Sequence, residues 1–599
     1  MAALCEEEQV DGDGYEAVWA DEQRGRICQA TNPLPAGALV ICDKPAAAVV
    51  LDSARLSHCF GCQQPVSSNP ARCSSCGNAV FCPSCSGADK RGPTLAKRLH
   101  AAVCPAYARI YSDEFAGSGD TSYLRMALHL AVLRAGLHES SMGDSDDDDV
   151  GATDAQEAES LSEVVAAVAD LEEHNHELPE RALAGLLGTA HAVRALVPAA
   201  ARASLEATMH DLGVVYTNSM TIGRVAIDPC DVEAHIARGG PGAHAALFAP
   251  CGLALPVSAA MLNHSCAPNC HWCVHNGRVC VRTLKAVDAG EELSISYVHA
   301  GGATNVRRTL LRRSFHFDCC CSRCARPAQQ TLHEDVRAGG LRLHRYVTHG
   351  SGDDGISGFV LPVFDDNSGD DSDSDSDEAG TRMGQWLRVH TSPLRCIPCN
   401  SQESIAARTA SRAEEQIHKI LAGLDKTDST IEQNASETRE SARMLRSRLQ
   451  QLQAANFKCS RYLHPLHTLA AEVSSRTVSV ALCLAAATGS PSGQAPSLPL
   501  LRLAEEHARR TLLSLQVSQG HSVWAGVAAA RLAIVLLSRR AHSDGARKRK
   551  RGQKHTSVDG NDGEIAVLFK QACVQLTAGL GSQHPATCTV QRYLQRIRS

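Results

Sequence analysis

The sequence predicts a multidomain α+β protein, and three observations support that fold class. The chain has 599 residues, which is too many for a single hydrophobic core. Its first half mixes short strand-like and helical patterns and carries cysteines at the spacing of metal ligands. From residue 404 onward, apolar residues recur at helical spacing. We therefore expect zinc-binding α+β domains followed by an α-helical C-terminal lobe.

Charge and cysteine content limit the functional class. The formal net charge of −6 argues against an overall basic nucleic-acid-binding protein. The acidic start, Cys5 to Glu8, lacks the basic and then apolar pattern of a signal peptide. No run of about 18 apolar residues is found, so no membrane-spanning helix is expected. Cysteines at zinc-ligand spacing in a nuclear or cytoplasmic protein are therefore predicted to be metal ligands, and the 26 cysteines are not taken as a disulfide framework.

Residues 13–58 are typical of short strands and turns. Leu34 to Gly37 forms a turn pattern, and the apolar run Ala38 to Ile41 follows it as a strand. Gly25 lies in a second turn, next to Arg26. A glycine here suits either an ordinary surface turn or a close approach of the backbone to a ligand.

Residues 59–104 carry the strongest metal signal in the chain. The ligand pattern is Cys59-x2-Cys62, Cys73-x2-Cys76, Cys82-x2-Cys85 and His100-x3-Cys104. Zinc prefers four such ligands in a tetrahedron, so this pattern supplies two closed, structural sites. In so small a segment, bound zinc would contribute on the order of 10 kcal/mol per ion to folding.

Residues 105–217 are expected to be helical. Leu124, Leu128 and Val132 predict an amphipathic helix over residues 121–137, and residues 158–209 are rich in alanine and leucine. The acidic run from Asp144 to Asp149 is typical of a solvated loop.

The most unusual stretch is Asn263 to Cys270, which holds two amides, an imidazole, a hydroxyl and two thiols in eight residues. Residues 279–297 then predict a β-hairpin with a turn at Asp288 to Gly290. Leu293, Ile295 and Tyr297 alternate onto one face, which alone indicates an ordinary core tyrosine.

A helix is expected next, followed by Phe315, Phe317 and three cysteines. Cys319, Cys321 and Cys324 make an incomplete zinc site, because a closed site needs a fourth ligand.

The order of these motifs resembles the SET- and MYND-domain lysine methyltransferases, the SMYD family, over roughly residues 13–325. This resemblance implies a small-strand SET β-fold split by a MYND zinc finger and a helical insertion. It also implies a cysteine-rich post-SET zinc site and a C-terminal lobe similar to tetratricopeptide repeats. The implied segments are 13–58 (N-terminal SET), 59–104 (MYND), 105–217 (insertion), 218–300 (core SET), 301–326 (post-SET), 327–403 (linker) and 404–599 (helical domain).

The resemblance further implies an S-adenosylmethionine-dependent protein-lysine N-methyltransferase that acts on histone or non-histone lysines. Tyr297 would be catalytic, and Phe315 and Phe317 would line the substrate channel. The implied cofactor-binding residues are Gly25, Arg26, Asn218, Asn263, His264 and Tyr297. On its own, an asparagine at position 218 is more often a helix or turn cap.

The resemblance implies about three zinc ions. The implied ligand sets are Cys59, Cys62, Cys82 and Cys85; Cys73, Cys76, His100 and Cys104; and Cys266, Cys319, Cys321 and Cys324. Three positions depart from the family pattern. Cys82 and Cys85 are separated by two residues where three are usual, Gln23 replaces a common glycine, and Phe315 and Phe317 include no tyrosine.

Two other functions remain open at this point. The chain could be a catalytically inactive MYND/SET adaptor that recruits peptide partners through the finger and the C-terminal helices. A nucleic-acid-binding finger is the weaker alternative, because only a small basic patch at Lys90, Arg91, Lys97 and Arg98 supports it.

The C-terminal half gives less specific signals. Asp365 to Glu378 predicts a disordered acidic stretch. Cys396-x2-Cys399 is half a zinc site, for which the unligated interpretation is favoured. His521-Ser522 and His584-Pro585 resemble weak repeat ends. The basic run Arg547 to Arg551 fits either a nuclear localisation signal or a solvated loop.

Overall fold

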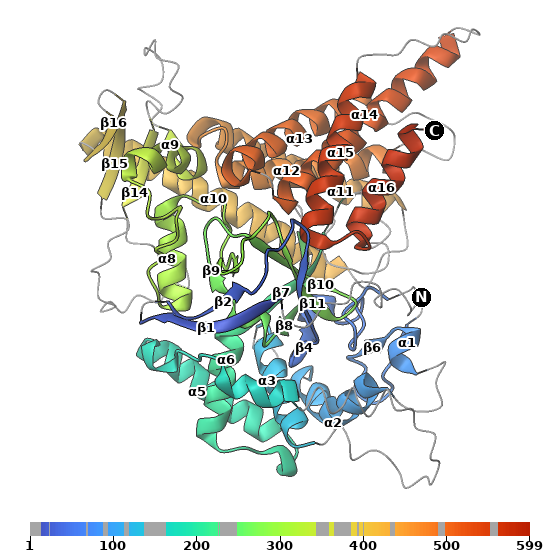
Figure 1. The fold of residues 1–599 in the computed structure, drawn as a ribbon. Coiled ribbons are helices and arrows are strands. Elements are labelled where there is room, and N and C mark those ends of the chain that lie inside the picture. Colours follow the sequence, from blue (N-terminus) through green and yellow to red (C-terminus); the bar gives the residue numbers. More distant parts are fainter. Residues whose placement is uncertain are drawn as a thin grey trace.

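The computed structural model describes most of the chain. The described residues are 14–22, 24–66, 70–87, 94–112, 119–136, 163–225, 227, 248–342, 359–363, 385–391, 394–398, 401–431, 438–488, 497–520, 522–550 and 561–598. Small sheets occupy the middle of the molecule, with the finger and the insertion on one side and the C-terminal helices on the other (Figure 1). The acidic runs, Gln23, Cys399 and Arg551 lie outside the described residues, as do the side chains of Cys396 and of residues 547–550.

The central sheets are antiparallel except for one short pair. Their strands are β1 (Tyr15–Asp21), β2 (Gly25–Ala30), β3 (Leu39–Asp43), β4 (Ala47–Val50), β7 (Met220–Val225), β8 (Phe248–Leu255), β9 (Asn263–His264), β10 (Cys270–His275), β11 (Arg278–Thr283) and β12 (Ser294–Ile295). The sheet orders are β1-β2, β10-β11-β3, β4-β8-β7 and β12-β9. Val40, Val279, Leu293 and Ile295 are buried in one core shared by several of these strands.

The predicted hairpin over residues 279–297 is wrong in its pairing. β11 pairs with β10 and β3, whereas β12 runs parallel to β9. The observed hairpin joins β10 to β11 through Asn276 and Gly277, which both have positive φ. Asn-Gly is a strong signal for a two-residue hairpin turn. The sequence therefore did contain a signal for the hairpin that is observed.

The zinc-finger region and the insertion pack beneath the central sheets (Figure 1). Their elements are β5 (Ala71–Arg72), β6 (Val80–Phe81), α1 (Pro83–Ser86), α2 (Leu95–Ile110), α3 (Ser122–Arg134), α5 (Glu180–Leu196) and α6 (Leu205–Asn218), with a short 3-10 helix η4 (Asn175–Glu177). α3 was expected to be amphipathic, but it is buried on nearly all sides. The reason is that it packs against β4 as well as against α2, α5 and α6.

An ion pair between a buried arginine and a partly buried aspartate holds α3 against the segment that follows β4. The guanidinium of Arg125, only 1% exposed, donates to Asp52 at 2.8 Å. Tyr111 and Thr121 also donate to this carboxylate. We predict that Asp52→Ala destabilises the protein by about 3–5 kcal/mol, because it leaves a buried cation without its partner. Denaturant unfolding measures this.

Asp21→Asn is the matched control for that prediction. Asp21 pairs with Arg24 at 2.9 Å, and both side chains are 45% exposed. Loss of such an exposed pair changes stability by at most about 1 kcal/mol. Equal effects of the two substitutions would contradict the assignment of Asp52 as the partner that neutralises the buried Arg125.

Residues 327–403 were expected to be a linker, but the described part is structured. It contains α9 (Ala328–Gly339) and an antiparallel sheet in the order β13-β14-β15-β16. These strands are β13 (Leu341–Arg342), β14 (Phe359–Val363), β15 (Gln385–Thr391) and β16 (Leu394–Pro398). Leu332 and Val336 of α9 pack on Phe359 and Leu361 of β14, which supplies this unit with its own small core.

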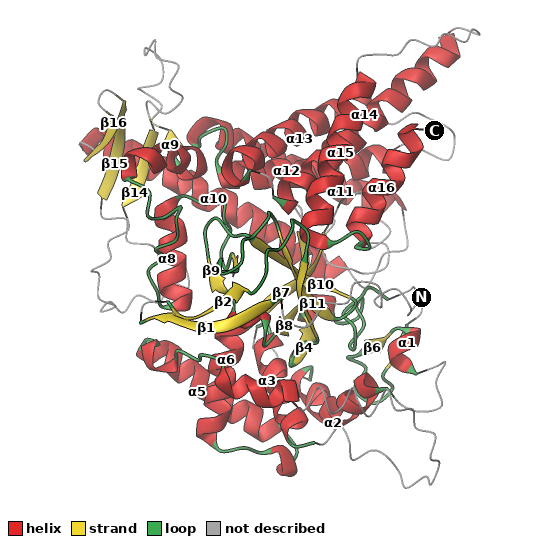
Figure 2. Cartoon of the chain, viewed as in Figure 1, coloured by secondary structure: helices red, strands yellow, loops and turns green. Residues whose placement is uncertain are grey.

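The C-terminal region is helical, as predicted (Figure 2). It comprises α10 (Ser401–Ile431), α11 (Thr438–Tyr462), α12 (Thr468–Thr488), α13 (Leu498–Gln519), α14 (Val523–Lys550), α15 (Asn561–Leu580) and α16 (Pro585–Arg598). Each helix packs on the next one in sequence. His584 precedes α16, and its Nδ1 accepts a hydrogen bond from the backbone of Ala586 at 3.2 Å.

Among the residues that the structure describes, one helix is long and apolar enough in composition to cross a membrane, although it holds no uninterrupted run of about 18 apolar residues. It covers Thr468–Ala487 within α12, and 89% of that window is buried inside the structure. A helix buried in this way fits the core of the C-terminal lobe.

Candidate active site and metal centres

A cavity of about 770 Å³ lies where the central sheets meet the insertion and the segment after α8 (Thr304–Phe315). The structure brings every residue predicted for cofactor binding, catalysis or the substrate channel into its lining. These residues are Gly25, Arg26, Asn218, Asn263, His264, Tyr297, Phe315 and Phe317.

Asn263 ties one wall of the cavity to the β1–β2 turn. Its Nδ2 donates to the carbonyl oxygens of Arg24 and Arg26, both at 3.1 Å. Gly25, between these two residues, has a φ of +62°. A Cβ there would meet no atom within 4 Å, so the backbone conformation, not lack of space, favours glycine.

Asn218 and Arg26 connect the cavity to the insertion. Asn218 is the last residue of α6, and its Nδ2 donates to the carbonyl of Glu172 at 2.8 Å. The guanidinium of Arg26 donates to the carbonyl of Asp170 at 2.8 Å. Both side chains are therefore held in fixed positions by backbone carbonyls.

His264 joins the tyrosine to the third cysteine cluster. Its Nδ1 accepts a hydrogen bond from the backbone N–H of Tyr297 at 2.9 Å, and its Nε2 lies 3.2 Å from Sγ of Cys266. Burial lowers the pKa of His264 to about 4, so the ring is neutral at pH 7. Because Nδ1 accepts, the proton of the neutral ring is on Nε2 and faces the sulfur.

Tyr297 is half-buried, and its ring lies in an aromatic environment. The hydroxyl donates to the carbonyl of Leu262 at 2.7 Å. The ring centroid lies 4.9 Å from that of Phe315 and 6.4 Å from that of Phe317. Burial raises the pKa of Tyr297, so the hydroxyl remains protonated at physiological pH.

Asn269 is a positioning residue to which no role was assigned from the sequence. Its Oδ1 accepts from the backbone N–H of Ser294, and its Nδ2 donates to the carbonyl of Glu292, both at 2.8 Å. These bonds fix β12 beside β9. The only sequence feature that pointed to Asn269 was that it is the second amide in the stretch from Asn263 to Cys270.

The predicted zinc ligands form three clusters. Within each cluster, the ligand atoms all lie within 4.8 Å of one another. Sulfur pairs lie 3.8 Å apart for Cys62–Cys82 and 3.7 Å apart for Cys73–Cys104. Zinc–sulfur bonds of about 2.3 Å in a tetrahedron place the sulfurs about 3.8 Å apart. The described donors therefore fit zinc in number, type and spacing.

The short spacing of Cys82 and Cys85 is accommodated by a helical turn. Cys82 is the N-cap of α1, and Pro83 follows as the first helical residue. In the second cluster, Nε2 of His100 lies 3.5 Å from Sγ of Cys76. Burial lowers the pKa of His100 to about 4, which keeps the ring in the neutral form that binds a metal.

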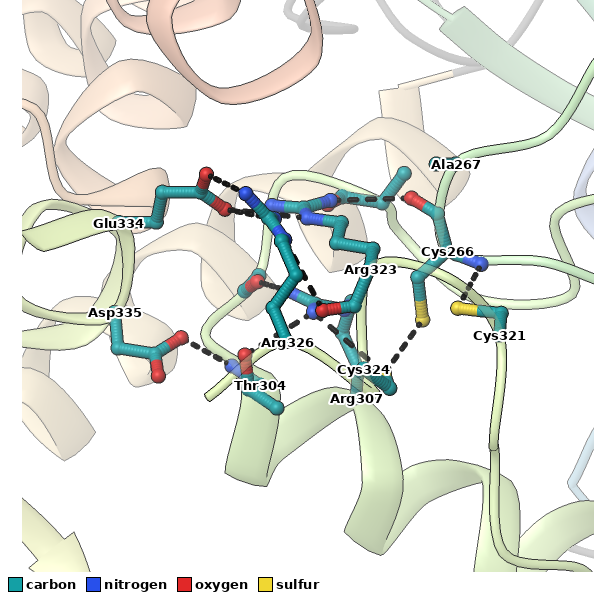
Figure 3. A network of polar contacts seen from close by, with 12 residues as sticks. Cys266, Ala267, Thr304, Arg307, Cys321, Arg323, Cys324, Arg326, Glu334 and Asp335 are labelled. Atoms are coloured by element: carbon teal, nitrogen blue, oxygen red, sulfur yellow. Dashed lines mark hydrogen bonds and ion pairs between the residues drawn. The ribbon is translucent and has the colours of Figure 1, made fainter. Parts of the chain in front are cut away.

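A buried arginine indicates that the third cluster carries negative charge. Arg307 is 1% exposed, and its Nη2 lies 3.9 Å from Sγ of Cys324 (Figure 3). Its other hydrogen-bond partners are the carbonyl of Gly302 and the hydroxyl of Thr304. In the described part of the chain, no carboxylate lies within ion-pair distance of this guanidinium. Since buried charges require compensation, four thiolates around a zinc ion would supply the missing anion.

Further arginines connect this cluster to α9. Arg323 donates to the carbonyl of Cys266 at 3.1 Å and to Glu334 at 3.3 Å (Figure 3). Arg326 makes a two-pronged contact with Glu334 at 2.8 and 2.9 Å. The cluster is thereby attached to the helix that follows it.

We predict that Arg307→Gln accelerates zinc loss from the third cluster by about tenfold, the lower end of the effect of outer-shell substitutions. The reason is that the neutral side chain no longer balances the thiolates. Release of zinc to a colorimetric chelator measures the rate. Arg312→Gln is the control, because Arg312 pairs with Asp318 at the surface. Unchanged release from Arg307→Gln would contradict the charge-balancing role.

Comparison with known protein families identifies the class of domain to which the cavity belongs. Residues 25–298 match the family model of the SET domain, so this protein contains a SET domain.

Individual relatives confirm the predicted resemblance to the SMYD family. Mouse histone-lysine N-methyltransferase SMYD3 is 38% identical over 73 residues, which cover 12% of this chain and 17% of that protein. Histone-lysine N-methyltransferase ASHR1 of Arabidopsis thaliana is 22% identical over 304 residues, 51% of this chain and 53% of that protein. A SET and MYND domain-containing protein of Dictyostelium discoideum is 33% identical over 73 residues, 12% and 19% of the two chains. The chain thus spans about half or less of the length of these relatives.

Proposed function

We propose that this protein is an S-adenosylmethionine-dependent protein-lysine N-methyltransferase acting on histone or non-histone proteins in the nucleus or cytoplasm. The observation that carries the proposal is that one cavity is lined both by the Asn263–His264 wall and by the phenol of Tyr297. The SET-domain match supports the same reaction class, and so do the names of the relatives, which are histone-lysine N-methyltransferases.

The donor would be held by the backbone turn at Gly25 and by the side chains of Arg26, Asn218, Asn263 and His264. S-adenosylmethionine supplies, when bound, a methyl group that is already activated on a sulfonium centre. The protein therefore needs no covalent nucleophile, and its main task is to position the two reactants.

The aromatic end of the cavity suits the acceptor amine. A free lysine is almost wholly protonated at pH 7, and only the neutral amine can attack. Phe315 and Phe317 form apolar walls beside Tyr297, which would lower the pKa of the lysine by desolvation. Their ring faces would also favour a methylated, cationic product.

The oxygens near Tyr297 would stabilise the transferring methyl. The phenol oxygen and the carbonyl of Leu262 lie 2.7 Å apart, and the phenol is neutral. Polarised methyl hydrogens make weak CH···O contacts with such oxygens. The zinc clusters, whose ligand sets are all complete, would be structural and take no part in the transfer.

Calorimetry with S-adenosylmethionine tests the proposal directly. We expect binding heat with the wild type and a loss of at least tenfold in affinity with Asn263→Ala, which removes the bonds to the β1–β2 turn. Incubation with labelled donor and a mixed protein extract, followed by mapping of modified lysines, would then identify substrates. A folded, zinc-loaded protein that gives no binding heat would instead support the inactive adaptor.

A further inference from the structure

Three cysteines form a row across the sheet β10-β11-β3, and none belongs to the three zinc clusters. Cys280 of β11 is the direct cross-strand partner of Cys273 on β10 and of Cys42 on β3. Direct partners in an antiparallel ladder point to the same face of the sheet. The sulfurs of Cys42 and Cys280 lie 3.3 Å apart, so these two thiols are in contact.

The row faces the C-terminal helices and not the SET core. Cys273 and Cys280 are buried in the hydrophobic cluster that includes residues of α12 to α15, and Cys42 packs at its margin. Val279 and Val281, the sequence neighbours of Cys280, are buried in the SET core on the other face. α15 packs against β10 and β11. The thiols therefore lie at the contact between the SET sheet and the C-terminal lobe.

The backbone geometry is compatible with a bond between the two sulfurs. Direct antiparallel partners have Cα atoms about 4.5–5.5 Å apart. Disulfides require a Cα separation of about 4.4–6.8 Å. Cys42 is on an edge strand and half-buried, so a small oxidant has access to it.

The two thiols differ in acidity in a way that assigns their roles. The hydrogen bond with Cys280 and the guanidiniums of Arg278 and Arg282 lower the pKa of Cys42 to about 7. The same contact, together with burial, raises the pKa of Cys280. Cys42 is thus the more acidic and the less buried of the two thiols, which makes it the attacking thiol and Cys280 its resolving partner.

We propose that Cys42 and Cys280 are a modification site at which a low-molecular-weight disulfide forms a reversible intramolecular bond. The thiolate of Cys42 attacks the small disulfide, forming a mixed disulfide and expelling one small thiolate, which takes up a proton. Cys280 then loses its proton, its sulfur attacks Sγ of Cys42, and the second small thiol leaves. Two protein thiols are oxidised, one small disulfide is reduced to two thiols, and both protons end on the leaving thiols.

The bond would have a measurable structural effect. It would join β3 to β11, which are separated in sequence by the finger and the insertion. Closing so long a segment restricts the unfolded chain and should stabilise the folded state against heat. This consequence does not depend on whether the protein transfers methyl groups.

The test uses full-length, zinc-loaded protein equilibrated with glutathione disulfide, alkylated and digested for mass spectrometry. We expect a reducible peptide pair that links Cys42 to Cys280, with zinc retained. The thermal midpoint should rise by several degrees in the wild type and stay unchanged in Cys42→Ala. Cys273→Ala is the matched control, because it removes the third thiol of the row and should leave the linked pair in place.

Three results would overturn the proposal, and each can be read from the wild type alone. The first is that Cys42 and Cys280 are both recovered alkylated. The second is that Cys42 is recovered only as a glutathione adduct, and the third is that Cys280 is linked to Cys273. Because the peptide map needs no substitution, a variant that fails to fold leaves the proposal fully testable.

Discussion

Replacing Tyr297 by phenylalanine should reduce methyl transfer by roughly 100-fold or more, the cost of removing one positioned polar group at a reacting centre. The hydroxyl that would be lost is the one that contacts the carbonyl of Leu262 within the aromatic part of the cavity. Donor affinity should change by only a few-fold, because Asn263 and His264 keep their own contacts. Labelled-donor assays measure the transfer, and calorimetry measures the binding.

Tyr15→Phe is the matched control for that substitution. Tyr15 packs against the same core as Tyr297 but does not line the cavity. It should retain full activity. If Tyr297→Phe turned over as fast as the wild type, Tyr297 would not be the catalytic tyrosine.

Removing one ligand of the third cluster should produce the second large effect. We expect protein purified without chelator to carry three zinc ions, and Cys324→Ser to carry two. Donor affinity should fall by tenfold or more, because the segment from Phe315 to Ser322 lines the cavity and leads directly to Cys324. Metal analysis and calorimetry measure the two outcomes.

Cys320→Ser is the control within the same segment. Cys320 is exposed and lies outside the four-ligand cluster. This variant should keep three ions, because it removes none of the four ligands. Two ions in the wild type would contradict the assignment of Cys266 as the fourth ligand.

The ligand clusters could be predicted because their signal is local. Pairs such as Cys59-x2-Cys62 fold into one short turn, so spacing alone nominates them. The assignment of Cys266 to Cys319, Cys321 and Cys324 came from family resemblance, and the structure places these four together. The roles of the cavity residues remain predictions, although the structure gathers them in one place.

The features that could not be predicted from the sequence depend on contacts between residues far apart in the chain. β9 and β12 are two residues long, too short for a hydrophobic period to show which strands pair. Arg307 stands in a helix with Arg308, Arg312 and Arg313, and composition gives no sign that it alone is almost fully buried. The sheet β13–β16 was missed because an acidic run interrupts its strands.

The residues that line the cavity are spread along the chain, and this has a consequence for folding during synthesis. Its walls come from segments scattered between Arg24 and Ser322, so more than half of the polypeptide must leave the ribosome before they can meet. The ligands of the first two clusters, by contrast, are all present once Cys104 has emerged. Because contacts distant in sequence form slowly, the nascent protein should acquire its first two metals well before it can recognise a methyl donor.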